Sequence, residues 1–414
     1  MFEYRNGHLH CEEVDLQTLA ADYGTPAYVY SKATILERWQ QYETALSGIP
    51  KRVCFAVKAN SNLAVLATLA RVGAGFDIVS GGELYRVLKA GGDPSSVVFS
   101  GVGKTAAEIA FALEKGIHSF NCESEAEIEL ISQIATSKGV RASIAIRVNP
   151  DVNANTHPYI STGLREHKFG VDISVAEGIY ARAASLPGIV AEGVSCHIGS
   201  QLLDLDPLLE AADKIVALVA RLRANGLPIR FLDLGGGLGV QYKPHEQNAS
   251  VAEFATRLRP KLAQLNLTLM LEPGRSIVAE AGILLTQVLI VKKNGEKTFV
   301  VVDGAMNDLL RPALYQAHHE ISPVVDMSDR AMMAADVVGP VCETGDFFAR
   351  DRHLPVLQSG DLIALRTAGA YGFVLASNYN SRPRSCELLI DGSNVHVARQ
   401  RETVDDLIRG ESVP

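Results

Sequence analysis

A short apolar run followed by a helical pattern repeats along the first third of the chain, and this repetition restricts the fold more than any other feature. Runs typical of strands begin at residues 53, 75, 97 and 119, about 22 residues apart. A segment with apolar residues at i, i+3 and i+4 follows each run, as expected of an amphipathic helix. Such alternation indicates parallel strands joined by crossover helices.

The alternation continues to residue 273 and reaches eight strands. The predicted strands cover residues 53–59, 75–80, 97–100, 119–124, 142–149, 193–200, 231–236 and 267–273. The predicted helices cover residues 62–72, 83–90, 106–115, 125–138, 175–185, 208–225 and 251–265. Eight parallel strands alternating with helices predict an α/β fold, a closed (β/α)8 barrel of the TIM type, with its active site where the βα loops gather.

Beyond residue 275 the pattern changes to β-type runs separated by turn residues. These runs cover residues 283–292, 298–303, 336–341, 361–366 and 387–390. A chain of 414 residues is long enough for two cores. We therefore expect a barrel domain over residues 31–275 and a mostly β C-terminal domain over residues 276–414. Residues 1–30 carry one short strand pattern and are assigned to the β domain, with the barrel as the alternative.

The charge and the cysteine pattern narrow the class of function. The net charge of −8 is spread over both halves without a basic block, which argues against nucleic acid or an anionic membrane surface as a partner. The most apolar late stretch, residues 282–291, is too short to span a bilayer. The six cysteines form no CxxC pair and no zinc-ligand spacing, which indicates reduced thiols and no metal. We expect a cytoplasmic protein that acts on a small polar molecule.

Lys58 is the most informative single residue, because it ends the first strand in the sequence CFAVKAN. Lysine is rarely buried. One interpretation is an edge lysine whose amine reaches solvent. The other is a Schiff-base lysine, since desolvation lowers the pKa of an amine and makes it nucleophilic.

Other candidate site residues follow later strands. The glycine-rich turn DLGGGLG, residues 233–239, ends strand seven, and phosphate sites in barrels lie near strands seven and eight. Glu272, in LEPGR, ends strand eight and is placed to pair with a protonated pyridine nitrogen. His197 and Ser200 follow strand six, where the imidazole is suited to stacking on a flat ring and the hydroxyl to binding a phosphate.

Three patterns are decoys. Residues 233–239 do not match the GxGxxG dinucleotide pattern, because the third glycine is displaced. SGVGKT at residues 100–105 resembles an ATP-binding loop, but Val98 stands where that pattern needs glycine. His318 and His319 have no HExxH context or third ligand, and we interpret them as surface histidines rather than metal ligands.

Six motifs in order, AVKAN, GFDIVSGGEL, HIGSQ, DLGGG, EPGR and CETGD, resemble the fold-type III decarboxylases, which depend on pyridoxal 5'-phosphate (PLP). The resemblance covers nearly the whole chain and implies the barrel-plus-β-domain architecture of alanine racemase. Residues 147–163, 311–315 and 339–343 are similar to the diaminopimelate decarboxylase pattern within that group. The expected reaction is therefore the PLP-dependent conversion of meso-2,6-diaminopimelate to L-lysine and CO2, the last step of lysine biosynthesis.

The resemblance also implies roles for individual residues. The cofactor would be bound by Lys58, which forms the Schiff base, and by Asp77, His197, Ser200, Gly237, Glu272, Pro273, Gly274, Arg275 and Tyr371. The substrate would be bound by Arg275, Arg311, Tyr315, Glu343 and Tyr371, with Glu343 accepting the distal ammonium. Cys342 would come from the partner subunit of a homodimer and protonate the carbanion, so that the two subunits share their active sites. Thr344 departs from the family, which often has serine there.

Three alternatives remain open. One is a decarboxylase of the same fold that acts on ornithine, arginine or carboxynorspermidine, although the Arg311–Tyr315 element argues against simple diamino acids, which present no distal carboxylate. Another is a catalytically silent PLP-binding homologue, against which Lys58, Glu272 and Cys342 count. A racemase of this fold would need a tyrosine base in place of the Cys342–Glu343 element.

Overall fold

The structure is a computed structural model that describes residues 2–152, 168–263 and 265–414. Contacts divide the chain into two compact units. The β unit comprises residues 1–37, 241–246 and 277–414, and the barrel unit comprises residues 38–240 and 247–276. The segment 241–246 belongs to the β unit although barrel residues flank it on both sides, a division that the sequence pattern did not predict.

Eight parallel strands form the closed barrel that the sequence predicted. The strands are β5 (Lys51–Ala56), β6 (Gly75–Ile78), β7 (Val97–Phe99), β8 (Ser119–Cys122), β9 (Ala142–Asn149), β11 (Ile189–Ser195), β12 (Phe231–Asp233) and β13 (Thr268–Leu271). Each strand pairs in parallel with its neighbours, and the β8–β9 and β13–β5 pairs complete the closure. A two-residue strand, β10 (Val171–Asp172), pairs with the end of β9.

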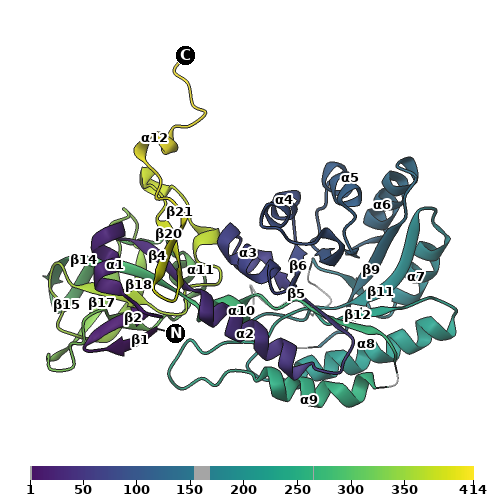
Figure 1. Ribbon diagram of the computed structural model, residues 1–414, viewed down its shortest axis with the longest axis horizontal. Coiled ribbons are helices and arrows are strands. Elements are labelled where there is room, and N and C mark those ends of the chain that lie inside the picture. Colours follow the sequence, from purple (N-terminus) through teal and green to yellow (C-terminus); the bar gives the residue numbers. More distant parts are fainter. Residues whose placement is uncertain (1, 153–167, 264) are drawn as a thin grey trace. The chain divides into compact units, whose positions relative to one another are not determined.

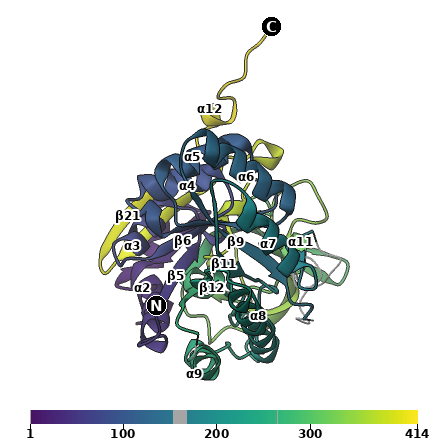
Figure 2. The same ribbon diagram turned by 90° about the vertical axis from the view of Figure 1, so that its right-hand side faces the viewer.

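Helices surround the barrel strands (Figure 2). They are α2 (Lys32–Ala45), α3 (Leu63–Ala70), α4 (Gly81–Lys89), α5 (Ala106–Lys115), α6 (Glu125–Ser137), α7 (Ala176–Ser185), α8 (Asp206–Ala224) and α9 (Val251–Leu262), followed by the short α10 (Arg275–Val278). Side chains at the N-terminal ends fix several starts: Thr105 and Glu108 form a capping box on α5, and Ser124 accepts a hydrogen bond from Glu127 N on α6. Helix α2 was not predicted.

Two strand ends differ from the prediction in a way that matters for the site. Strand β5 ends at Ala56, and residues Val57–Ala59 form a 3-10 turn that the Asn60 N to Val57 O hydrogen bond closes. Strand β11 ends at Ser195 rather than residue 200. Lys58 and His197 therefore lie on the turns after their strands, at the end of the barrel where active sites of this fold are found.

Large and small side chains complement one another inside the barrel. Cys54, Val98, Ala145, Phe231 and Met270 come from five different strands and form one buried cluster. Gly193 makes room for the largest of them, since a Cβ at that position would lie 2.1 Å from Phe231 Cζ. The barrel interior is thus a packed core and not a channel.

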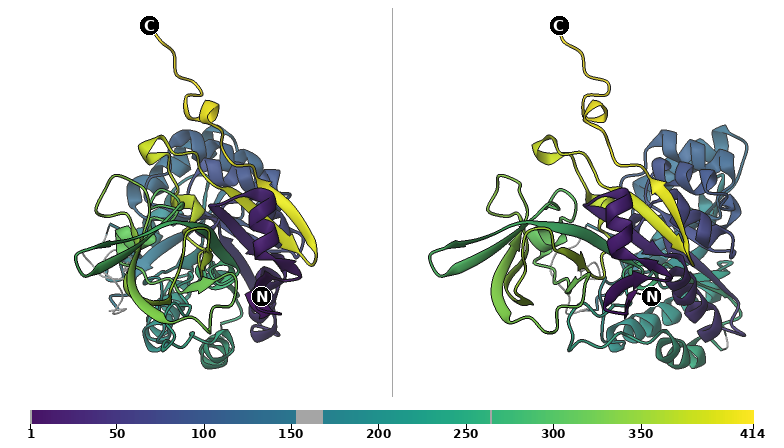
Figure 3. Two further views of the ribbon diagram at one scale, coloured as in Figure 1. Left: turned by 90° about the vertical axis from the view of Figure 1, so that its left-hand side faces the viewer. Right: turned by 60° about the vertical axis from the view of Figure 1, so that its left-hand side comes forward.

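The β unit is built on a sheet of nine strands (Figures 1 and 3). Its strands are β4 (Ala27–Ser31), β14 (Gly282–Asn294), β15 (Lys297–Val302), β16 (Ile321–Pro323), β17 (Met332–Val338), β18 (Phe347–Pro355), β19 (Leu362–Leu365), β20 (Cys386–Asp391) and β21 (Asn394–Arg399). Strand β4 lies between β14 and β20, which places the first residues of the chain inside this sheet.

Smaller elements complete the β unit. They are β1 (Phe2–Arg5), β2 (His8–Cys11) and β3 (Val14–Asp15), which form a separate sheet, with α1 (Leu16–Tyr23), α11 (Arg311–Tyr315) and α12 (Val404–Leu407). Strands β16, β18 and β21 and the three-stranded sheet were not predicted. Among the described residues, no helix has the length and apolar character needed to cross a membrane.

Candidate active site

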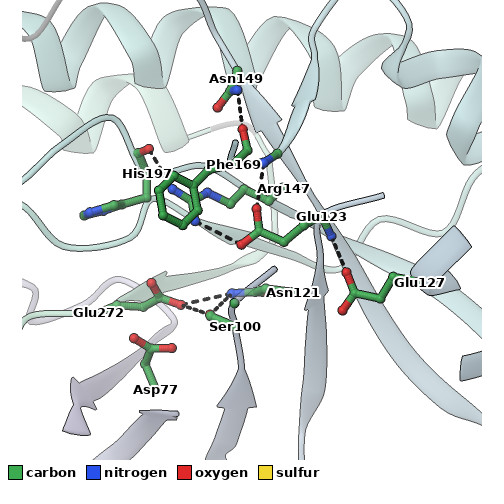
Figure 4. Close-up of polar contacts among 12 residues, drawn as sticks. Asp77, Ser100, Asn121, Glu123, Glu127, Arg147, Asn149, Phe169, His197 and Glu272 are labelled. Carbon is green, nitrogen blue, oxygen red and sulfur yellow. Dashed lines mark hydrogen bonds and ion pairs between the residues drawn. The ribbon is translucent and has the colours of Figure 1, made fainter. Parts of the chain in front are cut away.

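Three buried carboxyl groups gather at the C-terminal ends of the barrel strands. Asp77 lies on β6, Asp233 ends β12 and Glu272 follows β13. Asn121, on β8, donates from Nδ2 to Glu272 Oε1 and to Asp233 Oδ2, both at 3.0 Å. Ser100 Oγ donates to the same Glu272 oxygen at 3.3 Å, and Figure 4 shows Asp77 beside this group.

The positive charge near these carboxyl groups does not balance their negative charge. Burial raises the pKa of Glu272 well above its usual value, and the neighbouring charges of Asp233 and Asp77 act in the same direction. Burial also raises the pKa of Asp233. Asp77 Oδ1 is buried and accepts no hydrogen bond from any residue that the structure describes. A cationic N–H group at this place would stabilise the ionised carboxylates.

Lys58 brings one cation to the cluster, because its Nζ forms an ion pair with Asp77 Oδ2. The lysine side chain is 39% exposed. Of the two sequence interpretations, the Schiff-base one relied on desolvation of the amine, whereas the structure presents a partly exposed amine that pairs with an aspartate. The difference arises because β5 ends two residues before Lys58, so that the side chain leaves the strand and reaches the mouth of the barrel.

His197 presents a neutral ring next to the cluster. Burial lowers its pKa well below the usual value, and the cations Arg147 and Lys58 lower it further. Gly236 N donates to His197 Nδ1 at 3.3 Å, so the ring proton resides on Nε2. A neutral imidazole that is fixed in this way is suited to stacking on a flat ring.

The glycine-rich turn after β12 brings backbone close to the site. A Cβ on Gly236 would lie 2.3 Å from Glu272 O, and one on Gly237, whose φ is 113°, would lie 2.7 Å from Gly199 O. Arg275 Nη2 donates to Ser200 Oγ at 3.0 Å at the edge of the same region. Exposed backbone N–H groups, a hydroxyl and a guanidinium are the donors that a phosphate group needs.

A second polar network, which sequence reasoning missed, lies beside His197 (Figure 4). Glu123 Oε1 accepts from Arg147 Nη1 at 3.1 Å, and its Oε2 accepts from Gly170 N at 2.6 Å. Arg147 Nη2 donates to His197 O at 3.3 Å, and its guanidinium lies 4.8 Å from the centre of the Phe169 ring. Arg147 was only part of a motif in the sequence, and nothing in the spacing linked it to Glu123.

Lys104, the lysine of the SGVGKT motif that resembles an ATP-binding loop, is buried among structural contacts. Lys104 Nζ donates to Glu127 Oε1 at 2.5 Å and to the carbonyl oxygens of Gly101 and Asn121, both at 2.8 Å. Its side chain is buried. These contacts fix the turn after β7 and leave the amine turned away from solvent.

The remaining sequence candidates belong to the β unit, except Pro273 and Gly274, which follow Glu272 in the barrel unit. Arg311 and Tyr315 begin and end α11, and Tyr371 follows β19 with a φ of 56°. Cys342 and Glu343 are exposed on the turn between β17 and β18. Asp346 fixes that turn, since its carboxylate accepts from the backbone N of Met306 and of Val341, each at 2.7 Å. Residues 153–163 of the motif that spans 147–163 lie outside the described residues.

The interpretation of both residues 318 and 319 as surface histidines is wrong. His319 is fully buried and contacts Arg311, while His318 is partly buried between Arg352 and Glu320. No local pattern indicates this burial, because residues that contact His319, such as Tyr242 and Arg366, are distant in the chain. No cluster of metal-ligating side chains occurs among the described residues.

Comparison with known proteins decides the family. Residues 32–279 match the family described as "Pyridoxal-dependent decarboxylase, pyridoxal binding domain". The diaminopimelate decarboxylase of Pseudomonas aeruginosa is 55% identical over 412 residues, which cover 100% of this chain and 99% of the relative. That of Vibrio cholerae is 52% identical over 414 residues, with the same coverage. The chain belongs to the diaminopimelate decarboxylase family.

A solved structure of the family agrees with this assignment. The Helicobacter pylori diaminopimelate decarboxylase, in a crystal structure with L-lysine, superposes with a TM-score of 0.92 at 46% identity and covers 95% of this chain and 98% of its own. The resemblance found in the sequence motifs is thereby confirmed, as are the enzyme class, the fold and PLP as the cofactor.

The described barrel residues fit that cofactor. The cluster of Asp77, Asp233 and Glu272 suits a protonated ring nitrogen, because burial raises the pKa of Asp233 and of Glu272 even though the Lys58 amine pairs with Asp77. Lys58 supplies the amine, and the turn at Gly236 and Gly237 gives close backbone approach. The individual roles of the cofactor-binding residues, Pro273, Gly274 and Tyr371 included, stay predictions.

Proposed function

We propose that this chain decarboxylates meso-2,6-diaminopimelate to L-lysine and CO2, the last step of lysine biosynthesis. The observation that carries the proposal is the identity of 55% and 52% with two enzymes of that name over 99% of their lengths. The lysine in the Helicobacter pylori complex is the product of this reaction, which supports the same substrate.

In this proposal the barrel unit binds PLP, which supplies an electron sink for the bond that breaks. Lys58 Nζ would attach the cofactor and attach it again when the product is released. His197 would cover one face of the ring, and Glu272 would pair with the ring nitrogen. Ser200, Gly237 and Arg275 would bind the phosphate, with Pro273 and Gly274 shaping the turn that carries Arg275.

Residues of the β unit, together with Arg275 of the barrel unit, would bind the substrate. Arg311 and Arg275 are suited to carboxylates, because a guanidinium can donate two parallel hydrogen bonds. Tyr315 and Tyr371 would contribute hydroxyl groups, and Glu343 would accept the distal ammonium. A substrate without the distal carboxylate would leave buried Arg311 without that partner, which is costly.

Cys342 would deliver the proton that replaces the departing CO2, and it would act in the site of a partner subunit. Cys342 is exposed, whereas the other five cysteines are buried. The proposed assembly is a homodimer in which residues 1–30 and 276–414 of one chain complete the site formed by residues 31–275 of the other.

The test of the substrate is CO2 release from meso-diaminopimelate, ornithine, arginine and carboxynorspermidine, measured side by side on purified protein with added PLP. Preference for meso-diaminopimelate is the expected result. Preference for another of the four would overturn the proposed substrate and leave the family intact. Release from none would favour a silent homologue.

The test of the shared site mixes two inactive variants, Lys58→Ala and Cys342→Ala. If sites are shared across a two-fold dimer, random exchange restores about 25% of wild-type activity, because half of the dimers then contain one intact site. Each variant alone is the control. No recovery after verified subunit exchange would contradict the shared site.

A further inference from the structure

The side chain of Arg311 is confined on two sides within the β unit. The residue is 6% exposed at the start of α11. Its Nη1 lies 3.0 Å from His319 Nε2, and its Cζ lies 4.4 Å from the centre of the Tyr242 ring. The ring and the guanidinium are close enough for a cation–π interaction. Both partners therefore restrict how the guanidinium can turn.

The contacts of His319 settle which of its nitrogen atoms carries the proton. His319 Nδ1 lies 2.8 Å from Arg366 O, a carbonyl oxygen that only accepts. Nδ1 is therefore the protonated nitrogen, and Nε2 has the lone pair that accepts from Arg311. A neutral acceptor orients the guanidinium and leaves its positive charge intact. A carboxylate in the same place would neutralise that charge.

Tyr242 supports both residues. Its ring meets the His319 ring edge to face, with centroids 5.6 Å apart and an interplanar angle of 79°. It comes from residues 241–246, the segment that belongs to the β unit between two stretches of the barrel unit. The three side chains thus form a packed group: histidine orients one edge of the guanidinium, and tyrosine covers its face.

We propose that His319 is a positioning residue for substrate selection, which together with Tyr242 sets the orientation of Arg311 so that its guanidinium meets the distal carboxylate of the substrate. This inference rests on the proposed function. His319 acts through Arg311 and does not itself touch the substrate.

Two amide substitutions separate the two hydrogen bonds of His319. His319→Asn places an amide where Nδ1 was and keeps the bond to Arg366 O, but it removes the acceptor for Arg311. His319→Gln carries an amide oxygen to the place of Nε2 and keeps that acceptor. We expect KM for meso-diaminopimelate to rise about tenfold in His319→Asn, more than kcat falls, and to return to within about threefold of wild type in His319→Gln.

A double-mutant cycle distinguishes positioning from general packing. Arg311→Lys keeps the charge but has no planar guanidinium for His319 to orient. If His319 acts through Arg311, His319→Asn has no further effect on KM in the Arg311→Lys background. A structural role alone would give the same loss in both backgrounds and lower the Tm of both.

Equal KM in His319→Asn and wild type, equal loss in the Asn and Gln variants, or an additive cycle would each overturn the inference. If His319→Asn does not fold, Tyr242→Leu removes the other support of the guanidinium, with Tyr242→Phe as the matched control that keeps the ring. KM must then rise more in Tyr242→Leu than in Tyr242→Phe, and equal KM values in the two variants would overturn the inference. A wild-type enzyme that releases no CO2 from meso-diaminopimelate would instead contradict the proposed function.

Discussion

Lys58 and Asp77 form an ion pair between the turn after β5 and the end of β6. The pair places the Lys58 amine beside three buried carboxyl groups, of which Asp233 and Glu272 have raised pKa values. The charge and the nucleophilicity of residue 58 are separate properties, and a substitution can remove one and keep the other.

Lys58→Arg keeps a cation beside Asp77 but removes the primary amine. We expect turnover to fall by more than about 100-fold and the absorbance of covalently bound cofactor to disappear, while Tm of the cofactor-free protein stays near wild type. Lys58→Ala should show the same loss of turnover together with a lower Tm. Retained turnover in Lys58→Arg would contradict the assignment of Lys58 as the attachment point.

Glu83 makes stability depend on pH. Burial raises its pKa to about 7 from the ordinary value of 4.5. Because the folded state holds the Glu83 proton more tightly than the unfolded state does, protonation of Glu83 stabilises the fold. This stabilisation is complete below pH 4.5 and is lost as the pH rises through about 7. Glu83→Gln lacks this loss and can still accept from Val79 N, which donates to Glu83 Oε2 at 2.7 Å.

The measurement is the free energy of unfolding of the cofactor-free protein in urea at pH 5 and pH 8. The advantage of Glu83→Gln over wild type should be larger at pH 8, by at most about 3 kcal/mol. An advantage that does not change between the two pH values would show that Glu83 ionises normally.

Glu123 and Arg147 form a buried ion pair, with side chains 3% and 9% exposed. Glu123→Ala leaves the guanidinium without that carboxylate and Gly170 N without its acceptor, so we expect a loss of about 3 kcal/mol in unfolding free energy. Glu129→Ala is the control, because Glu129 pairs with Arg182 on the surface and its removal should cost less than about 1 kcal/mol. Equal losses, measured in urea, would contradict a structural contribution from the buried pair.

Gly236 tests the backbone turn of the proposed phosphate site. Gly236→Ala would bring a Cβ within 2.3 Å of Glu272 O, so the turn must shift. We expect PLP affinity, measured by fluorescence titration of the cofactor-free protein, to fall at least about tenfold, the loss of one hydrogen bond to a charged group. Gly178→Ala, in α7 with nothing near its Cβ, should instead add about 0.5–1 kcal/mol of stability and leave the affinity unchanged. Unchanged affinity in both variants would exclude this turn from the site.

Periodicity predicted the barrel well, because each βα repeat carries its own local pattern. Helix α2 was missed although Ile35, Trp39, Tyr42 and Leu46 repeat at helical spacing and are all buried. The polar run between them masked the pattern. That signal was available in the sequence and was not used.

The missed parts of the site had no local signal. Glu123 meets Arg147 only because β8 and β9 pair to close the barrel. Arg311 lies eight residues before His319 in the chain, but only the distant Tyr242 and the Arg366 carbonyl show that this histidine is buried. Strand-end residues were predictable, since a parallel barrel brings all its C-terminal ends together. Pairs that depend on tertiary packing were not.

Strand β4 pairs with β14 on one side and β20 on the other. During synthesis residues 27–31 leave the ribosome first, yet their hydrogen-bonding partners, residues 282–294 and 386–391, are made only after the whole barrel sequence. The nascent chain must therefore keep an apolar strand unpaired while roughly 250 residues are added, at about 5–20 residues per second. An unpaired strand exposes backbone N–H and C=O groups that can pair with other chains. The nascent chain should therefore need chaperones most before β14 and β20 pair with β4.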